Sequence, residues 1–388
     1  MSPNEEYYKG REQAYVKHYF LSNYLERLVH KTAGRFNHIV YVDGFSGPWQ
    51  SASERYDDTS FGIALRSLRA AKASWKALDR TVSMTAVLVE TAAEPFRLLQ
   101  QLPAQYPDID IKPLRGDFSS LAADIRREIP NEAFAFLFID PKGWRIRLND
   151  LRPLLSRPNT EVVFNFMFDF INRFATISDP KVISGLDELM PAGSWQTQLI
   201  SSGAGTASAT RKAALVEAFS SSLSQVGSYP YVLETPILRP LIDRTLYSLI
   251  YATRKPIGVE VFRDCQIKAL REQASVRTKA KREAAIELSG QPDMFGSETQ
   301  FAPNEADLWL AGEERDALAA LLAEIPLFPK TVRYDALWPK VLSRHAIRKT
   351  TLGHAVGALH KDGAIVSTEW EPRKRVPSDH YNLSRAAD

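Results

Sequence analysis

The apolar positions of the first 170 residues follow two alternating spacings. Short apolar runs rich in β-branched and aromatic residues predict five strands, at residues 38–43, 84–90, 109–118, 133–140 and 160–167. Apolar residues at helical spacing predict four further segments as helices, at residues 13–32, 60–73, 92–102 and 118–129. Thr59 or Ser60 would cap the second of these helices. Strands that alternate with helices predict an α/β fold with a parallel sheet covered on both faces.

The pattern becomes less regular beyond residue 180. The elements predicted there are a loop or lid at 201–209, a helix at 213–226, a strand at 245–254 and a long basic helix that starts at 256. Residues 289–304 are rich in Gly, Pro, Ser and Asn, which is typical of a linker. We therefore expect an α/β domain at 1–262, a basic helix and linker at 263–304, and a separate domain at 305–388.

Three helices followed by two strands are predicted for this last domain, which is the order of elements in a winged helix. The helix at 349–361 would occupy the recognition position, and the basic loop "PRKRVP" would be the wing. The expected architecture is thus a Rossmann-like α/β sheet plus a C-terminal winged-helix domain. A winged helix used only for protein contacts or dimerisation is the alternative.

Charge is unevenly distributed along the 388 residues. The net charge is +3, yet residues 263–282 carry seven Lys/Arg against two acids, and residues 330–388 carry eleven against six. This basic C-terminal third favours an anionic partner such as nucleic acid, although such a run can also be a solvated face. The residues expected to contact nucleic acid are Arg277, Lys279, Lys281, Arg282, Arg348, Lys349, Arg373, Lys374 and Arg375.

Composition argues against several classes of protein. The hydrophobic fraction of 44% supports a sizeable core, and no apolar stretch approaches the roughly 20 residues that span a bilayer. The N-terminal residues are polar and charged, unlike a signal peptide. A single cysteine, Cys265, leaves no internal disulfide framework and no cysteine-rich zinc site. We expect a cytoplasmic protein with no membrane partner.

Four of the predicted strands lead to an acidic residue: Asp43, Glu90, Asp117 and Asp140. Parallel sheets bind ligands beyond the carboxyl ends of their strands. In the segment "DGFSG" the glycines would let the backbone approach a ligand closely. Glu90 would accept the ribose hydroxyls and Asp117 would face an adenine amino group, so these positions together predict a nucleoside site. Each acid alone is equally compatible with an ordinary solvated strand end.

Motifs that the chain lacks narrow the choice of nucleoside. The sequence contains no G-x-x-x-x-G-K-[ST] and no G-x-S-x-G, which argues against a P-loop NTPase and a typical α/β-hydrolase. The strict G-x-G-x-x-G of dinucleotide sites is missing too, so S-adenosylmethionine (SAM) fits better. The residues expected to bind SAM are Lys17, Asp43, Gly44, Phe45, Gly47, Glu90, Asp117 and Phe118.

The segment "FLFIDPKGW" ends the fourth strand and carries the candidate catalytic residues. In amino-methylating enzymes an Asp-Pro-Pro-Tyr motif at this place binds the target amine, and an aromatic ring stacks on an extruded base. Asp140, Pro141 and Trp144 would take these roles, unless the segment is only a turn with Trp144 packed. Further polar groups that would lie near this cleft are His18, Asn165, Asp169, Asn172 and Arg173.

Several stretches of the chain resemble a bacterial family, the three-Cys-motif partner proteins (TcmP). They include "YVDGFSGPW", "FLFIDPKGW", "EVVFNFMFDFINRF" and "YATRKPIGVEVFRDCQIKA", and the C-terminal part resembles the winged-helix domain that accompanies this family. The resemblance implies a methyltransferase-like α/β fold and a partner protein with a three-cysteine, radical-SAM-like motif. Two departures stand out: Trp49 replaces the third glycine of many SAM sites, and Lys142-Gly143 replaces the Pro-Tyr of the amino-methylating motif.

The sequence therefore predicts a SAM-dependent methyltransferase that acts on nucleic acid, with the winged helix contacting the polynucleotide. A second hypothesis is a catalytically silent nucleic-acid-binding partner subunit. A third is a metal-dependent nuclease that uses acids such as Asp43, Asp117 and Asp140. The third ranks last, because acids spread over separate strand ends suit a nucleoside better than one metal ion.

Overall fold

A computed structural model describes residues 3–47, 51–174, 179–193, 195–201, 208–289 and 305–386. The chain divides into two compact units, Met1–Arg254 (unit 1) and Lys255–Asp388 (unit 2). Trp49 and the linker residues 290–304 lie outside the described residues, as do 202–207 of the expected loop. None of the helices in the described ranges combines the length and the apolar character needed to cross a bilayer.

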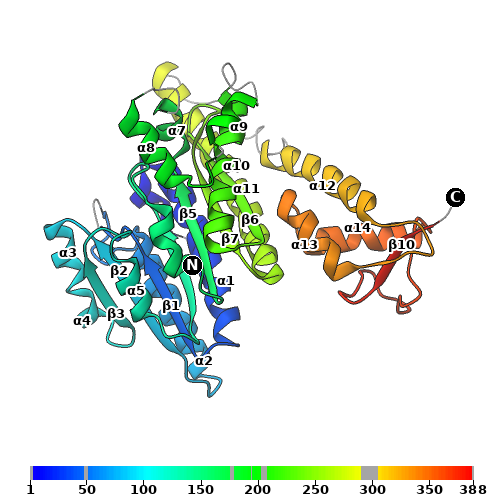
Figure 1. The fold of residues 1–388 in the computed structure, drawn as a ribbon, viewed down its shortest axis with the longest axis horizontal. Coiled ribbons are helices and arrows are strands. Elements are labelled where there is room, and N and C mark those ends of the chain that lie inside the picture. Colours follow the sequence, from blue (N-terminus) through cyan, green and yellow to red (C-terminus); the bar gives the residue numbers. More distant parts are fainter. Residues whose placement is uncertain are drawn as a thin grey trace. The chain divides into compact units, whose positions relative to one another are not determined.

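Unit 1 is built on a seven-stranded sheet with the order β3-β2-β1-β4-β5-β7-β6 (Figure 1). Its strands are β1 (His38–Asp43), β2 (Ser83–Glu90), β3 (Asp110–Arg115), β4 (Phe134–Ile139), β5 (Thr160–Phe166), β6 (Tyr231–Leu238) and β7 (Thr245–Thr253). The five strands predicted first are confirmed and are parallel. The sheet is not parallel throughout, because β6 and β7 are joined by a short hairpin and β7 pairs antiparallel with β5.

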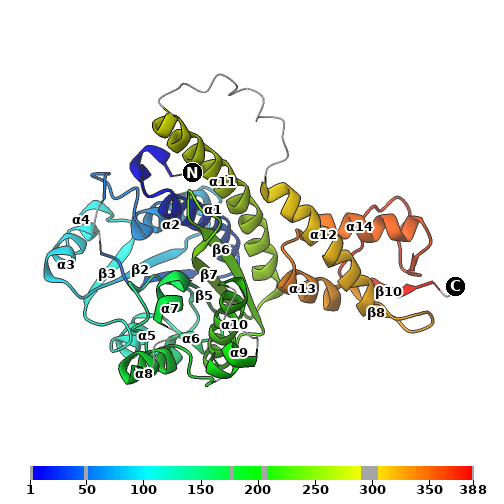
Figure 2. The same ribbon diagram turned by 90° about the horizontal axis from the view of Figure 1, so that it is seen from above.

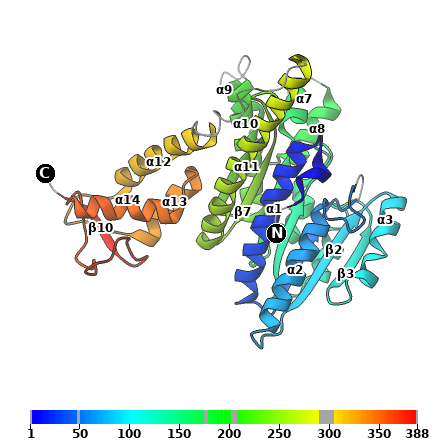
Figure 3. The same cartoon turned by 180° about the vertical axis from the view of Figure 1, so that it is seen from behind.

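Helices cover both faces of this sheet. They are η1 (Glu5–Tyr8), α1 (Glu12–Ala33), α2 (Ser60–Lys76), α3 (Ala93–Leu99), α4 (Leu102–Gln105), α5 (Ala122–Glu128), η2 (Leu148–Leu151), α6 (Arg152–Leu155), α7 (Phe168–Phe174), α8 (Pro180–Leu189), α9 (Trp195–Ser201) and α10 (Ser208–Gly227). Figure 2 shows α1 and α2 on one side of the sheet and α5, α8 and α10 on the other. In Figure 3 the side that carries α1 and α2 faces the viewer.

Successive side chains of each strand point to opposite faces of the sheet, and each face is buried under a layer of helices. On one face Val40, Leu137 and Phe164 belong to a single apolar cluster with residues of α5 and α10. On the other face the Tyr24 ring of α1 lies 5.5 Å from the Phe136 ring, between ring centroids. Burial on both faces explains why the central strands read as nearly continuous apolar runs.

Several helix boundaries differ from the expected ones for local reasons. The helix expected at 92–102 is divided into α3 and α4, because Pro103 lacks the N–H that would continue the first helix. The helix expected from residue 118 begins only at Ala122, after a turn in which Asp117 Oδ1 accepts from the backbone N–H of Ser120 at 2.9 Å. Thr59 is the residue that caps α2, since its hydroxyl accepts from the N–H of Gly62.

The described residues of unit 2 form four helices and a small antiparallel sheet of order β8-β10-β9. Its elements are α11 (Pro256–Ser289), α12 (Glu305–Glu324), β8 (Val332–Arg333), α13 (Tyr334–Arg344), α14 (Lys349–Lys361), β9 (Ile365–Val366) and β10 (Asn382–Arg385). The buried Arg263 of α11 donates to the carbonyl oxygens of Leu342 and Ser343 at 2.6 and 3.1 Å, which satisfies the end of α13. One arginine of the basic run is therefore a structural residue.

Candidate functional site

The turn after β1 is organised by the buried carboxylate of Asp43. Its Oδ2 accepts from the hydroxyls of Tyr41 at 2.9 Å and Ser60 at 2.6 Å, and its Oδ1 accepts from the backbone N–H of Phe45 at 3.0 Å. Burial raises the pKa of Asp43, although the three hydrogen bonds act in the opposite direction. Asp43 therefore ties the turn to the start of α2.

The backbone of the same turn is also occupied. The N–H of Gly44 donates to the Phe138 carbonyl at 3.0 Å, and the N–H of Ser46 donates to the Val89 carbonyl at 2.8 Å. A Cβ on Gly44 would lie 3.0 Å from the buried Phe118 ring, so this glycine makes room for a side chain of the protein itself. The close approach of a ligand to the glycines of this turn, Gly47 included, stays a prediction.

Glu90, the last residue of β2, and Asp117, two residues after β3, lie at the same edge of the sheet as this turn. Glu90 is buried, and its Oε1 accepts from the Thr91 hydroxyl at 3.2 Å and the N–H of Ala92 at 2.7 Å. The side chain of Asp117 is 52% exposed, and its Oδ1 accepts from both the N–H and the hydroxyl of Ser120 at 2.9 Å. The two carboxylates expected to bind a nucleoside therefore share one edge.

Asp140, just beyond β4, is held from two sides. The ammonium Nζ of Lys17, on α1, lies 2.5 Å from Oδ2, and the amide Nδ2 of Asn165, at the end of β5, donates to Oδ1 at 2.5 Å. Burial by itself would raise the pKa of Asp140, but the charge of Lys17 and the hydrogen bonds from Lys17 and Asn165 outweigh it and lower the pKa. With 22% of its side chain exposed, Asp140 is a fixed, ionised carboxylate that solvent still reaches.

His18 follows Lys17 on α1 and is buried as a neutral imidazole. Its Nδ1 lies 2.9 Å from the hydroxyl oxygen of Tyr8. Burial, reinforced by the positive charge of Lys17, lowers the pKa of His18 to about 3, although the charge of Asp140 opposes this shift. A ring with this pKa carries no charge at neutral pH, so His18 supplies a polar but uncharged group beside the Lys17–Asp140 pair.

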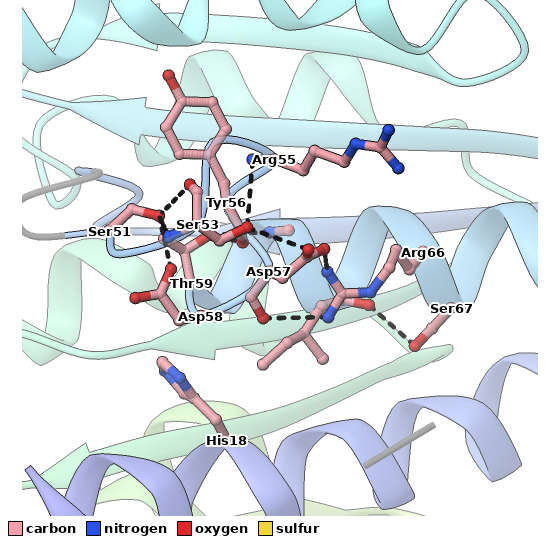
Figure 4. A network of polar contacts seen from close by, with 12 residues as sticks. His18, Ser51, Ser53, Arg55, Tyr56, Asp57, Asp58, Thr59, Arg66 and Ser67 are labelled. Atoms are coloured by element: carbon pink, nitrogen blue, oxygen red, sulfur yellow. Dashed lines mark hydrogen bonds and ion pairs between the residues drawn. The ribbon is translucent and has the colours of Figure 1, made fainter. Parts of the chain in front are cut away.

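A polar loop between β1 and α2 faces His18. Figure 4 shows the imidazole pointing from α1 toward the segment that carries Asp58. The Asp58 carboxylate accepts from the hydroxyl of Ser51 at 2.5 Å and from the N–H of Ala52 at 2.8 Å, and the neighbouring Asp57 pairs with Arg66. The adjacent carboxylates of Asp57 and Asp58 thus hold this loop together and connect it to Arg66 of α2.

An open groove with a volume of about 630 Å³ lies beside Asp117. Its lining includes Ser119, Ser120, Trp144, Arg145 and Lys181, and a second hollow of about 700 Å³ continues along α8. The indole of Trp144 packs against the Phe170 ring, with 5.0 Å between the centroids, while also bordering the groove. Trp144 is therefore packed against the protein, as the alternative for this segment expected, and its stacking on a base stays a prediction.

The strand-end acids do not form a metal site within the described ranges. No group of three His, Cys, Asp or Glu side chains there has the arrangement of metal ligands. Instead, Asp43 and Asp140 each accept from protein donors at both carboxylate oxygens. Among the described residues, therefore, no set of metal ligands supports the hypothesis of a metal-dependent nuclease.

Four of the basic residues expected to contact nucleic acid form ion pairs with acids of unit 2: Lys374 pairs with Glu371 at 3.1 Å, and the other three lie outside the basic loop. Arg277 is only 4% exposed and pairs with Glu305 at 3.2 Å. Lys349 Nζ lies 2.8 Å from an oxygen of Asp379, and Arg348 lies 3.9 Å from an acid on α11. Each of these side chains therefore has an acidic neighbour within unit 2.

The other basic residues have a more accessible setting. The exposed ones are Lys279, Lys281, Arg282, Arg373 and Arg375. Lys374 Nζ donates to the Ser378 hydroxyl at 2.6 Å. A Cβ on Gly357 of α14 would clash with the carbonyl oxygen of Arg375, so this glycine lets the basic loop pack directly on the helix.

Sequence reasoning missed part of this site. Tyr41 holds Asp43 from two positions earlier in β1, and that spacing, which places both side chains on one face of the strand, was the available signal. Asn165 was expected near the cleft, and the structure places its amide on Asp140. Asp169 was expected there too; it is buried and pairs with two arginines of the β6–β7 hairpin, which no pattern in the sequence indicated.

Among the other expected groups, Asn172 Oδ1 accepts from Arg211 at 3.0 Å. The side chain of Arg173 lies outside the described residues. Phe45 and Pro141 adjoin the turns after β1 and β4, with the Phe45 ring 5.9 Å from that of Phe118 between centroids.

Strand order and site position define unit 1 as a Rossmann-type α/β domain, with its polar groups at the carboxyl edge of the sheet. No family model matches the chain, and no curated protein matches it. One similar solved structure is a Legionella pneumophila protein of family DUF519, with 11% identity, 61% of this chain and 84% of that chain covered, and a TM-score of 0.36. Another is loganic acid methyltransferase with SAH, with 11% identity, 74% and 92% covered, and a TM-score of 0.30. Similarity this low carries no argument about function.

Proposed function

We propose that this chain is a SAM-dependent methyltransferase that modifies an amino group of nucleic acid. The observation that carries the proposal is Asp140, a carboxylate fixed by Lys17 and Asn165 at the carboxyl edge of a Rossmann-type sheet and followed by Pro141. The sheet is compatible with this class and argues against a dinucleotide-binding domain, because β7 lies between β5 and β6, which differs from the 3-2-1-4-5-6 order of such domains.

The residues at the neighbouring strand ends fit a nucleoside-bearing cofactor. Glu90 is buried and its Oε1 is already oriented by the N–H of Ala92, so we assign Oε2 to the ribose hydroxyls. Asp117, half exposed beside the groove, is assigned to the adenine amino group. When bound, SAM supplies an electrophilic methyl group. Lys17, expected to bind the cofactor, acts in this proposal through Asp140.

Asp140 positions the target amine. A carboxylate oxygen carries two lone pairs, so Oδ1 and Oδ2 retain acceptor capacity beside Asn165 and Lys17. Because its pKa is lowered, the carboxylate stays ionised at neutral pH and accepts an N–H of the amine. Methyl transfer depends on alignment of the nitrogen more than on a strong base, which suits a carboxylate that two neighbours hold in place.

Unit 2 supplies the contact with the polynucleotide in this proposal. Helices α12, α13 and α14 followed by β9 and β10 have the order of a winged helix, with α14 in the recognition position. The exposed Arg373 and Arg375, in the loop between the two strands, are placed to contact phosphates. A partner protein with a three-cysteine motif is a further proposal that rests on the family resemblance alone.

One observation favours a second candidate, a catalytically silent nucleic-acid-binding subunit. The N–H groups of Gly44 and Ser46 already donate to strand carbonyls, so this turn offers a cofactor fewer donors than a glycine-rich loop normally does. Under this alternative the chain binds nucleic acid and does not bind SAM.

Calorimetric titration of the full chain with SAM separates the two candidates. We expect micromolar binding that weakens at least about tenfold in Glu90→Gln, since losing a charged acceptor costs roughly 1.5–3 kcal/mol. Glu94→Gln is the matched control, because Glu94 is 84% exposed on the adjacent α3 and should bind SAM like the wild type. No heat of binding at millimolar SAM would reject the methyltransferase and leave the silent subunit.

Nucleic-acid binding is measured separately, as affinity against salt concentration. The double variant Arg373→Gln/Arg375→Gln should bind more weakly, with a salt slope reduced by about 2, because two phosphate contacts are lost. Arg344→Gln is the control, since Arg344 is 63% exposed on α13, outside the basic loop. Equal slopes in the double variant and the wild type would contradict the proposed wing.

A further inference from the structure

The β6–β7 hairpin has an exposed apolar tip. Its loop, residues 239–244, is closed by a hydrogen bond from the N–H of Arg239 to the carbonyl of Arg244 at 2.9 Å. Leu241 and Ile242, at the tip, are 54% and 51% exposed. Within the described part of unit 1 they are the only two consecutive large hydrophobic residues with such exposure. Leu241 and Ile242 thus form a small exposed apolar surface at the tip, whereas apolar residues exposed singly are normal.

The hairpin lies at the edge of the sheet that carries the candidate site. Leu249 of β7 pairs with Asn165, the residue that donates to Asp140. Because β7 runs antiparallel to β5 and Ser248 pairs with the last residue of β5, the chain from Ser248 back to Thr245 extends beyond the carboxyl end of β5, over roughly 10 Å at 3.3 Å per residue. The tip therefore stands on the side from which a substrate would reach Asp140.

Two arginines at the base of the tip are anchored on one buried carboxylate. Asp169 of α7 is 2% exposed, and its two oxygens lie 2.7 Å from Arg239 Nη2 and 2.5 Å from Arg244 Nη2. One carboxylate neutralises only one of the two guanidinium charges, and the arginine side chains remain 37% and 43% exposed. Asp243, in the same loop, balances the remaining formal charge, so the loop and its anchor are together neutral. The anchor holds the hairpin in a defined position and keeps cationic groups on either side of Leu241 and Ile242 in the sequence.

We propose that this hairpin is a wedge that enters a nucleic-acid duplex beside the target base, with Leu241 and Ile242 between base steps and Arg239 and Arg244 near phosphates. The inference rests on the proposed function. A base inside a duplex must leave the stack before its amino group reaches an enzyme carboxylate. Apolar side chains inserted at a base step are one means by which proteins unstack a duplex. Arg239 and Arg244, whose side chains are 37% and 43% exposed beside the apolar pair in the sequence, are the groups that would contact the phosphates.

The test uses the full chain and oligonucleotides that carry 2-aminopurine, whose fluorescence rises when the base leaves the stack. The wild type should raise the fluorescence of the duplex severalfold, and Leu241→Ser/Ile242→Ser should abolish at least four-fifths of that rise. Leu78→Ser is the control, because Leu78 is 70% exposed between α2 and β2, at the opposite edge of the sheet. Binding of single-stranded oligonucleotide should stay within twofold in both variants, and their thermal midpoints should match the wild type.

Three results would overturn the wedge. The first is a double variant that unstacks the duplex as well as the wild type does. The second is a double variant that loses single-strand binding to the same extent, since the tip would then be a general contact. The third is a wild-type protein that leaves duplex fluorescence unchanged, which would point to a protein partner at the apolar pair. Calorimetry with SAM keeps the proposals separate: unstacking without SAM binding rejects only methyl transfer, and SAM binding without unstacking rejects only the wedge.

Discussion

The neighbouring strands β1 and β4 each lead to an aspartate, Asp43 as the last residue of β1 and Asp140 directly after β4, and the two carboxylates are held in opposite ways. Asp43 is fully buried, its partners are the neutral donors of Tyr41, Ser60 and a backbone N–H, and burial raises its pKa. Asp140 keeps 22% exposure, has the cation of Lys17 as a partner, and has a lowered pKa.

This contrast separates two roles that look alike in the sequence. The acceptor capacity of Asp43 is used to join a turn to a helix, whereas Asp140 is ionised, oriented and open to solvent. The end of a parallel strand is thus a favourable place for a functional acid. The hydrogen-bond partners of the acid decide whether its carboxylate only stabilises the fold or remains available to a ligand.

The largest expected effect is on methyl transfer in Asp140→Asn. We expect the rate of transfer to nucleic acid to fall at least about 100-fold, since the variant loses the charged acceptor that aligns the amine. SAM affinity measured by calorimetry should change less than twofold. Asp124→Asn, on the exposed surface of α5, should retain wild-type activity. A loss below tenfold in Asp140→Asn would remove Asp140 from the proposed mechanism.

The next effect is on stability in Asp43→Asn. The amide NH2 group cannot accept hydrogen bonds, so buried donors of Tyr41 or Ser60 lose their partner, at a cost of about 2 kcal/mol in the free energy of unfolding. The free energies of unfolding of the wild type, Asp43→Asn and the control Asp124→Asn are measured by urea denaturation. Asp124→Asn should lose less than about 0.5 kcal/mol, because it removes only an exposed ion pair. Equal stability of the two variants would contradict the structural role of Asp43.

The smallest effect concerns the pH dependence of stability and His18. The pKa of this ring is about 3 in the folded chain, against 6.5 for an unperturbed histidine, so between these values the unfolded chain binds a proton that the folded chain does not. Stability should therefore fall by about 1.4 kcal/mol per pH unit as the pH decreases below 6.5. Groups that act on His18 include Lys17, Asp140, Asp58 and Arg11.

Unfolding of the wild type, His18→Gln and His30→Gln between pH 7 and pH 5 measures this contribution. His18→Gln should show a shallower slope than the wild type, whatever its absolute stability. His30→Gln, a change at a half-buried histidine on the same helix, should keep the wild-type slope. Parallel slopes in all three proteins would show that His18 is not held neutral.

The core of the sheet was predictable because its central strands are buried on both faces and therefore consist of consecutive apolar residues, as in β4. β6 was not predicted, since it lies at an edge, buries only every second residue over much of its length, and contains Pro236, which argues against a central strand. Counting charges located the basic third of the chain, but it could not predict which of these residues are buried. Arg277 is buried and pairs with the exposed Glu305, while Arg373 is exposed.

The sequence by itself determined the alternation of strands and helices and the placement of four acids at one edge of the sheet, because both follow from short-range periodicity. Only the tertiary structure decided which acid has which partner. Lys17 reaches Asp140 across 123 positions of the chain, and Ser60 reaches Asp43 across 17. No local pattern encodes such pairs, since they depend on how α1 and α2 pack against the strand ends once the sheet has formed.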